Sequence, residues 1–368
     1  MERNERKINT GKKGSGRKSP GKTALRIALI ILGVLLLIGL IAGAVVLLKL
    51  AKMNNGATGI VPQVSTPAPI PTPEATLVPV IDPSELDLSE DHDPDIEPGD
   101  MTDDPIYSQN QIDPDVINIF MMGNDARDER DHGRTDSMMI VSYNKRTRKA
   151  KVVSLLRDTW IYIPGREKWN RLNTAYRFGG VGLAINTINT NFGLDVQYYM
   201  RVDFNALVSI TDKLGGIDLE LTEREVQYIN NGCTSGEPLP ERAGWHHLNG
   251  AQTLVHARNR KLGNGDWSRT ERQRAVMMAF LRRAKQERDA KSLMSLVNEL
   301  SNLVETNMTP FQLVSLAVDV VLGGELELES RALPFEGTWQ YAWESGMAVI
   351  HIDIQKNKQL LHNYLYEG

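Results

Sequence analysis

Residues 27–48 form an uncharged apolar run of 22 residues, IALIILGVLLLIGLIAGAVVLL, which constrains the chain more than any other feature. At about 1.5 Å per residue, a helix of this length crosses the roughly 30 Å hydrocarbon core of a bilayer. Nine Lys and Arg residues precede the run, whereas Lys49 and Lys52 are the only basic residues between it and Arg127. The positive-inside rule therefore predicts a cytoplasmic N-terminus and an extracytoplasmic remainder.

Two other interpretations of this run are a cleaved signal peptide and a buried core helix. The run is long for the apolar part of a signal peptide, and the following residues, LKLAKMNNGA, offer no convincing A-x-A cleavage site. We therefore expect an uncleaved signal anchor that crosses the cell membrane once.

Charge falls into three blocks, although the formal net charge is −4. Residues 1–52 carry a net charge of +9, residues 53–115 carry fourteen acidic and no basic residues, and residues 116–368 are nearly neutral at +1. Eleven of the 17 prolines also lie within 53–115, which favours an extended, solvated tether over a binder of loosely held divalent cations. These features predict a basic cytoplasmic tail (1–26), a transmembrane anchor (27–48), a Pro-rich acidic spacer (49–115) and one folded domain (116–368).

Composition also excludes several classes of function for the folded domain. A single cysteine, Cys233, rules out an intrachain disulfide. The net charge of +1 and the expected location outside the cell argue against nucleic-acid binding. Neither a G-x-S-x-G nucleophile elbow nor a P-loop lysine motif occurs in the sequence.

The pattern of residues 116–368 is typical of an α/β fold. Strands are expected at 116–122, 137–143, 150–156, 217–221, 326–333 and 348–352, and helices at 181–192, 204–214, 250–256, 269–288, 291–304, 310–322 and 356–364. The polar turn 144–149 predicts an antiparallel hairpin. Asp203 and Asn249 are candidate helix caps, and Ser268 with Glu271 forms a candidate capping box. Because strands recur between helices to the end, we expect one three-layer αβα domain around a central mixed sheet.

Acidic and basic residues gather at the ends of the first three strands. Asp125 follows the first strand, Arg134 and Asp136 precede the second, and Arg157-Asp158 follows the third. The predicted hairpin places Asp136 opposite Arg157, and a parallel first strand brings Asp125 to the same edge, where open α/β sheets hold ligands. A hard cation that bridges carboxylates and phosphate oxygens is the simplest explanation of such a cluster. Surface ion pairs and strand-end caps are the alternative.

A second group of polar residues surrounds the start of the predicted helix 269–288. It consists of Arg258, Arg260, Arg269, Arg272 and Gln273. In an extended segment Arg258 and Arg260 point the same way, and the last three residues share one helix face. Guanidinium forks near a helix N-terminus suit pyrophosphate. A solvated basic helix end is the alternative, although arginine is disfavoured at a helix start.

Other side chains have weaker signals. His256 lies near these arginines and is a candidate proton relay, with a packed histidine as the alternative. The six tryptophans, among them Trp267, could line a lipid or sugar site, whereas core packing is the default explanation.

Several separated motifs, taken in order, resemble those of the LytR–CpsA–Psr family of bacterial cell-envelope proteins. The motifs are GNDAR, GRTDSMMIVSYN, SLLRDTWIYIPG, RLNTAY, DKLGGIDLEL, LNGAQTLVHARNRK and GDWSRTERQR, all after a basic tail, a membrane run and a spacer. The resemblance is strong over about residues 116–288 and looser elsewhere. It implies an extracytoplasmic α/β domain with an apolar channel for a polyprenyl chain.

The resemblance also assigns roles to residues. Asp125 and Asp136 match carboxylates associated with a divalent cation, Mg²⁺ or another such as Mn²⁺, and Arg157 and Asp158 match the family's Arg-Asp pair. A further set faces the pyrophosphate, and we include neighbouring arginines in it: Arg134, Arg157, Arg258, Arg260, Arg269, Arg272 and Gln273. Asn173 and Asp266 match supporting positions.

This chain departs from the family pattern in three places. Leu156 stands where a proline is usual, Arg171 where a lysine is usual, and Ile161 where some members carry an extra arginine. These departures leave the choice of acceptor and polymer open.

The function implied by the resemblance is transfer of a glycopolymer from undecaprenyl pyrophosphate to peptidoglycan at the membrane of a Gram-positive bacterium. Arg157, Asp158 and Asp136 are the expected catalytic residues, with Asp158 a candidate to orient or deprotonate an attacking sugar hydroxyl. Teichoic acid, capsule and other wall glycans all remain open as the polymer. A polyprenyl-pyrophosphate pyrophosphatase and a non-enzymatic lipid-binding or regulatory envelope module are the alternatives.

Overall fold

The computed structural model describes residues 60–61, 103–124, 135–286 and 303–367. The predicted membrane run 27–48, most of the spacer, and Asp125 and Arg134 lie outside these ranges. So does the predicted helix 291–304 up to residue 302, and residues 303–304 are not helical. Within the described ranges, no helix combines the length and apolar character needed to cross a membrane.

A six-stranded mixed sheet forms the centre of the fold, as expected from the sequence. The strand order is β11 (Glu305–Thr306), β8 (Tyr198–Asp203), β3 (Val116–Asn124), β4 (Thr135–Asn144), β5 (Lys149–Leu155) and β12 (Glu327–Leu333). β3 runs parallel to β8 and β5 parallel to β12, whereas β4 is antiparallel to both of its neighbours. The predicted β4–β5 hairpin is therefore confirmed, and β3, β5, β8 and β12 all end at one edge of the sheet.

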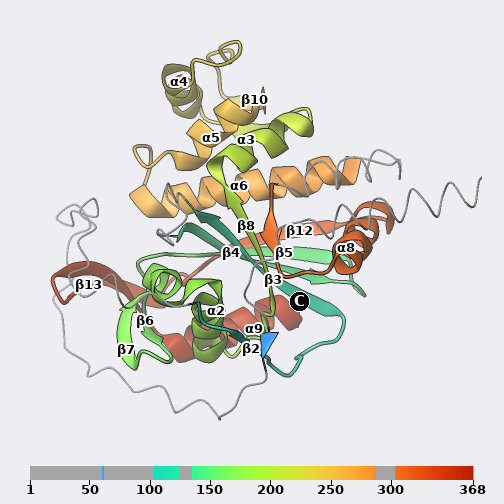
Figure 1. Ribbon diagram of the computed structural model, residues 1–368. Coiled ribbons are helices and arrows are strands. Elements are labelled where there is room, and N and C mark those ends of the chain that lie inside the picture. Colours follow the sequence, from blue (N-terminus) through green and yellow to red (C-terminus); the bar gives the residue numbers. More distant parts are fainter. Residues whose placement is uncertain (1–59, 62–102, 125–134, 287–302, 368) are drawn as a thin grey trace, which may run out of the picture. The chain divides into compact units, whose positions relative to one another are not determined.

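Helices cover both faces of this sheet (Figure 1). α2 (Leu172–Phe192) and α9 (Ile354–Tyr366) lie on one face, and α6 (Gly265–Gln286) crosses the other. Strand residues alternate between the two faces: Phe120 and Ile140 join the core beneath α2 and α9, whereas Met121 and Met139 pack towards α6. The three-layer αβα prediction is thus correct for the described residues.

A second apolar cluster packs on the outer side of α6. It is built from α3 (Phe204–Lys213), α4 (Glu223–Gly232), α5 (Gly250–Arg258) and the two-stranded sheet of β9 (Ile217–Leu221) and β10 (Gly244–Leu248). Three of its helices have side-chain caps, because Asp203, Thr222 and Asn249 each accept a hydrogen bond from a backbone N–H of the first turn. The predicted caps Asp203 and Asn249 are confirmed.

Smaller elements complete the fold. The hairpins β6 (Trp160–Ile163) with β7 (Lys168–Arg171) and β13 (Trp339–Glu344) with β14 (Met347–Ile352) lie beside the central sheet. α8 (Pro310–Leu322) matches its predicted range, and β1 (Ile60–Val61) pairs with β2 (Ile106–Tyr107). The sequence pattern did not indicate β6, β7, β8, β10, β13 or α4.

Two local predictions at the candidate site are wrong. α6 begins at Gly265 rather than at Arg269, because the Ser268 hydroxyl accepts a hydrogen bond from the Asn264 N–H at 2.7 Å inside the first turn. Ser268 is therefore not the cap of a capping box. Arg258 is the last residue of α5 and does not lie in an extended segment, because this helix continues two residues beyond His256.

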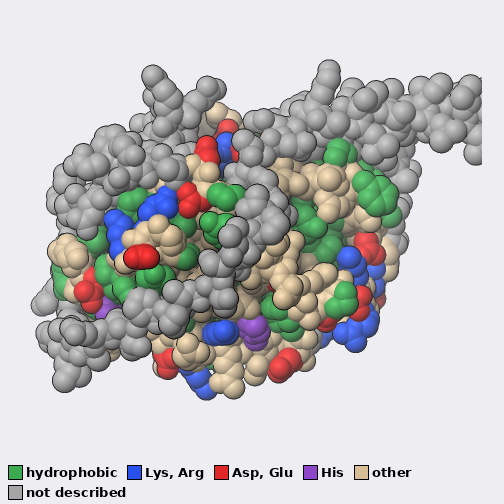
Figure 2. All heavy atoms as spheres, turned by 60° about the horizontal axis from the view of Figure 1, so that its bottom comes forward, with side chains coloured by type: hydrophobic (Ala, Val, Ile, Leu, Met, Phe, Trp, Pro, Cys, Tyr) green, Lys and Arg blue, Asp and Glu red, His purple; other side chains and the backbone are tan. Residues whose placement is uncertain are grey.

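Figure 2 shows the side of the molecule that points downward in Figure 1. Lys and Arg side chains lie there beside Asp and Glu side chains and between hydrophobic ones. Charges of both signs are thus mixed on this face, which agrees with the near-neutral net charge of residues 116–368.

A close approach between α3 and α5 yields the first prediction. A Cβ atom on Gly250 would lie 2.3 Å from the backbone oxygen of Val208, so the Gly250→Ala substitution must push α5 away from α3. We expect a loss of about 2 kcal/mol in the free energy of unfolding, measured by urea denaturation. The control is Gly232→Ala in α4, where the nearest atom is a methyl group of Val255 at 3.0 Å that can rotate. Equal stability of the Gly250→Ala and wild-type proteins would contradict the close packing.

Candidate active site

Of the two predicted metal-binding aspartates, only the backbone of Asp136 is described, and it lies at the edge where β3, β5, β8 and β12 end. Asp125 directly follows β3, whose last residue Asn124 pairs with Thr135 of β4. Asp136 is the second residue of β4, and its side chain, like Asp125 and Arg134, lies outside what the structure describes. The β4–β5 pairing reaches Met139 and Ser154, which lie three residues from Asp136 and Arg157 respectively.

Arg157 and Asp158 occupy a buried turn after β5. Their relative exposures are only 3% and 4%, so their charges require close partners. Asp158 contacts the Nε of Arg157 at 3.4 Å and the Nε of Arg171 at 3.6 Å. Hydrogen bonds to backbone carbonyls hold the turn: the Thr159 hydroxyl donates to the Leu156 carbonyl at 2.7 Å, and the Asn173 N–H donates to the Arg157 carbonyl at 3.2 Å.

The first turn of α6 adds a second carboxylate and a third arginine to this turn. Asp266 contacts the Nε of Arg157 at 3.6 Å and also the guanidinium of Arg269. We call the five residues Arg157, Asp158, Arg171, Asp266 and Arg269 the arginine–carboxylate network. It holds three positive and two negative groups in a buried place, an excess of positive charge that suits an anionic ligand.

The remaining predicted residues separate into two groups. Arg258 and Arg260 are exposed, and the Arg258 guanidinium lies 4.5 Å from the centre of the Phe204 ring. Arg272 is buried and directed elsewhere: its Nε donates to Glu225 at 2.8 Å, and its Nη atoms donate to the carbonyls of Asn259 and Leu262. These contacts hold the loop before α6, so the predicted shared face of Arg269 and Arg272 does not give them a shared environment.

Gln273 and Asn173 carry buried oxygen atoms. The Gln273 amide N–H donates to the Ala257 carbonyl at 3.5 Å, whereas its Oε1 has no hydrogen-bond partner among the described residues. The Oδ1 of Asn173 also has no hydrogen-bond partner among the described residues, whereas the Asn173 backbone N–H donates to the Arg157 carbonyl. Buried polar atoms of this kind usually have a partner, so both positions are compatible with a bound ligand.

An apolar pocket of about 140 Å³ begins beside Gln273. It lies between the sheet, α3, α5 and α6, and its lining includes Met121, Met139, Phe204, Leu207, Ile210, Leu254, Val276, Met277 and Phe280. Its polar side chains are Ser137, Asp203, Arg258 and Gln273, and Gly123 and Ser137 connect it to the sheet edge. An apolar space with a few polar groups at one end fits an amphiphilic ligand.

A second cavity, of about 40 Å³, lies at the first turn of α6. We call it the carboxylate cavity, because Asp158 and Asp266 line it together with Trp267 and Tyr341. Burial raises the pKa of Tyr341, and the carboxylates of Asp266 and Asp158 raise it further, against the hydrogen bond from Trp267. Tyr341 therefore stays protonated at neutral pH.

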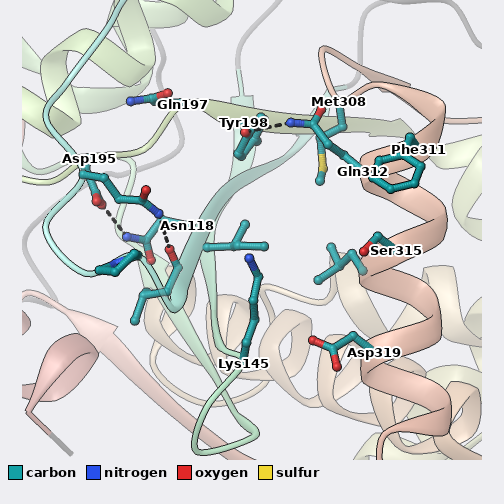
Figure 3. A pocket seen from close by; sticks show the side chains of 15 residues that line it. Asn118, Lys145, Asp195, Gln197, Tyr198, Met308, Phe311, Gln312, Ser315 and Asp319 are labelled. Carbon is teal, nitrogen blue, oxygen red and sulfur yellow. Dashed lines mark hydrogen bonds between the residues drawn. The ribbon is translucent and has the colours of Figure 1, made fainter.

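A larger cavity, of about 390 Å³, lies beside α8 and the start of β3 (Figure 3). Asn118, Lys145, Tyr198 and Gln312 line it, and Gln312 donates a hydrogen bond to the Tyr198 hydroxyl. None of the residues predicted for the site lies here. The larger cavity therefore does not contain the charged network. We assign the site to the network, because the chemically reactive groups meet there.

The predicted metal site stays a prediction. Among the described residues, no group of three or more His, Cys, Asp or Glu side chains is placed to hold a metal ion. Of the two expected ligands, Asp125 and the Asp136 side chain both lie outside the described part. The fold does pair the two preceding residues: Asn124, the residue before Asp125, pairs with Thr135, the residue before Asp136.

His256 is a packed histidine rather than part of the arginine–carboxylate network. It is 3% exposed, and burial lowers its pKa to about 4, with Glu225 opposing and Arg272 reinforcing the shift. The imidazole is therefore neutral in the folded protein at neutral pH.

The lowered pKa of His256 predicts how the stability of the protein changes at acidic pH. The pKa of His256 lies near 4 when folded and near 6.5 when unfolded, so below pH 6.5 the unfolded chain binds a proton that the folded chain does not. Stability should fall from pH 6.5 downward, with a loss on the order of 2 kcal/mol at pH 5. His256→Gln should flatten this decline in urea denaturation between pH 7.5 and pH 5. The control His247→Gln, at an exposed histidine, should keep it, and an unchanged slope in the His256 variant would refute the assignment.

Similar proteins agree with this architecture. A polyisoprenyl-teichoic acid–peptidoglycan teichoic acid transferase, TagU of Bacillus mycoides, is 31% identical over 201 residues, which cover 54% of this chain and 63% of TagU. The match therefore spans less than two thirds of that relative. Regulatory protein MsrR of Staphylococcus aureus is 28% identical over 252 residues, covering 68% of this chain and 75% of MsrR.

Solved structures share the fold. A structure of YwtF (TagT) of Bacillus subtilis with bound octaprenyl pyrophosphate lipid superposes with a TM-score of 0.54 and 22% sequence identity, over 70% of this chain and 93% of that one. At this identity the likeness concerns the fold. Residues 89–364 match the LytR_cpsA_psr family, and the chain therefore belongs to the LytR–CpsA–Psr family.

Proposed function

We propose that this chain is a membrane-anchored, extracytoplasmic phosphotransferase that moves a glycopolymer from a polyprenyl (undecaprenyl) pyrophosphate carrier to peptidoglycan. The observation that carries the proposal is the apolar pocket along α6, which lies next to the buried arginine–carboxylate network. Apolar space beside clustered guanidinium groups matches a ligand with a hydrocarbon tail and an anionic head. The names of TagU and of the lipid-bound TagT structure support the same ligand class.

The pyrophosphate is held by arginines from three elements. Arg157 follows β5, Arg269 lies on α6, and Arg258 ends α5 at the mouth of the apolar pocket. Arg260 adds an exposed positive charge beside Arg258. Arg272 supports the site indirectly, because its guanidinium N–H groups donate to Glu225 and to the loop before α6. Fixed guanidinium groups stabilise the charge that grows on the leaving phosphate.

The transfer breaks one bond between phosphorus and oxygen and forms another. The oxygen of an acceptor hydroxyl attacks the phosphorus that carries the glycopolymer. The bond from this phosphorus to the bridging oxygen breaks, and its electron pair leaves with polyprenyl phosphate. Asp158, buried beside two arginines, accepts the hydroxyl proton, which then passes to solvent. The product is a phosphodiester between polymer and wall.

Asp125 and Asp136 would hold a divalent cation, Mg²⁺ or Mn²⁺, at the edge beside this site. Carboxylate oxygens are the ligands that such hard cations prefer. The β3–β4 register supports the proposal, because Asn124, the residue before Asp125, pairs with Thr135, the residue before Asp136. The cation would neutralise charge on the pyrophosphate oxygens. Arg134, between these two aspartates in sequence, is proposed to face the same phosphates.

The proposed location follows from the N-terminal region. The apolar run 27–48 is proposed to anchor the chain in the membrane, and the acidic spacer to carry the folded domain towards the wall. A polyprenyl carrier stays in the membrane, so this anchor keeps enzyme and donor on the same surface.

Hydrolysis is the second candidate function. The carboxylate cavity, at about 40 Å³, has room for water beside Asp158, and water attacking the same phosphorus would make the chain a pyrophosphatase. Mass analysis of the products with and without peptidoglycan separates the two activities. A chain that binds the lipid but never converts it would instead be a binding or regulatory module.

Removal of two arginines that are proposed to bind the pyrophosphate tests the proposed function. Arg157→Ala and Arg260→Ala should each lower the transfer of a lipid-linked polymer to peptidoglycan by about 10²-fold or more, because each removes a charge that stabilises the leaving group. The control is Arg146→Ala, whose side chain is 66% exposed and pairs with Asp115 at the far end of the β4–β5 hairpin. Thermal melting checks that each variant is folded. Full transfer activity in both the Arg157 and Arg260 variants would contradict the proposal.

Filling the apolar pocket tests the position of the lipid tail. Met277→Trp places a bulkier side chain in a space of about 140 Å³, so the KM for the lipid donor should rise about tenfold. Met277→Leu conserves volume and should change this KM by less than about threefold. A donor KM that is the same in the Trp variant and in wild type would place the tail elsewhere.

A further inference from the structure

The β13–β14 hairpin carries a row of aromatic side chains on one face of β13. Trp339, Tyr341 and Trp343 occupy alternate positions of β13, so their side chains project from the same side of the strand. Ala342, between them, points the other way and packs with Trp160. Trp343 is 42% exposed, and Trp339 and Tyr341 are half-buried. The hairpin thus presents a row of aromatic rings outside its packed core.

This row leads to the carboxylate cavity. The Trp339 ring lies 4.7 Å from the Trp267 ring on α6 and meets the Tyr341 ring nearly edge-on at 5.1 Å. The Trp267 indole N–H donates to the Tyr341 hydroxyl at 3.2 Å, and these two residues line the cavity with Asp158 and Asp266. Three aromatic rings from two distant segments therefore stand at the mouth of a space that contains two carboxylates.

We propose that Trp267, Trp339 and Tyr341 form the subsite for one neutral sugar ring of the glycan acceptor, whose attacking hydroxyl reaches into the carboxylate cavity. This inference rests on the proposed function and assigns the acceptor to a part of the molecule that none of the predicted phosphate-binding arginines lines.

The chemistry of the subsite fits a sugar. A pyranose ring has weakly positive C–H groups on its faces, which pack against the negative faces of aromatic rings. Its hydroxyl groups donate to carboxylates such as Asp158 and Asp266. Tyr341 accepts from Trp267, and within the described residues its own O–H has no hydrogen-bond acceptor, so this proton is available for a sugar oxygen.

The same groups argue against the anionic donor in this cavity. Two carboxylates repel a pyrophosphate, whereas the apolar pocket has one carboxylate, Asp203, together with Arg258 and Gln273. Asp266 and Gln273 lie seven residues apart on α6, which is about 10 Å along the helix axis. Donor and acceptor thus have separate sites, with Asp158 lining the one for the acceptor.

The test uses the full chain in detergent and a soluble acceptor probe, the β-1,4-linked tetramer of N-acetylglucosamine. Binding of this tetramer is followed by tryptophan fluorescence, and transfer is followed with a polyprenyl-pyrophosphate-linked glycan donor. Trp339→Ala should weaken tetramer binding about tenfold and raise the ratio of acceptor KM to donor KM by a similar factor. Trp339→Phe, which keeps a ring, should recover most of both.

The control is Trp245→Ala, which removes an exposed tryptophan of β10 that lies in a different cluster and should leave tetramer binding unchanged. Equal acceptor KM in Trp339→Ala and wild type, or a rise in donor KM alone, would overturn the inference. Absence of tetramer binding to the wild type would also overturn it. Binding without any lipid turnover would support the subsite and count against the proposed transferase, so the two failures are distinguishable.

Discussion

The Arg157 guanidinium contacts a carboxylate on each side, Asp158 at the end of β5 and Asp266 at the start of α6. A buried charge is stable only with its partner, and removal of one partner costs about 3–5 kcal/mol in typical proteins. The pair of contacts therefore holds the first turn of α6 against the end of the sheet. Once this turn is placed, Gln273 and Met277 follow two and three turns later along the apolar pocket.

The β6–β7 and β13–β14 hairpins also support this arrangement. Arg171, the last residue of β7, contacts Asp158 and donates to the carbonyl of Ala348 in β14. The Ile350 N–H of the same strand donates to the Asp158 carbonyl at 2.9 Å. The β13–β14 hairpin thus both holds the turn at Arg157 and Asp158 and carries the aromatic row that we assign to the acceptor. The proposed acceptor subsite thus adjoins the network through Asp158 and Asp266.

Some features were predictable because their signals are local. The strand around Val152, the β4–β5 hairpin and the cap Asp203 each depend on residues within about ten positions, and all three are confirmed. The clustering of Arg157, Asp158 and Asp266 also agrees with the expectation from motifs. The predicted start of α6 was wrong, because the Ser268 hydroxyl has two possible backbone N–H partners. Only the folded loop selects the N–H of Asn264.

Other features had no local signal. Arg272 resembles the neighbouring arginines in sequence, yet Glu225, 47 residues earlier, turns it away from them. Tyr341 approaches Trp267 across 74 residues, so periodicity could not indicate the aromatic subsite. Arg171 drew notice only as a departure from the family's usual lysine, and its contact with Asp158 depends on how β7 lies against the β5 turn.

The sequence by itself determined the α/β class, the family and the residue types of the site. It could do so because hydrophobic periodicity, proline content and short motifs are properties of neighbouring residues. The tertiary structure alone decided which charges meet, which arginine serves as support, and where the apolar pocket and carboxylate cavity open. These depend on the burial of charges and on packing between segments far apart in the chain, and burial decides whether a charge must have a partner.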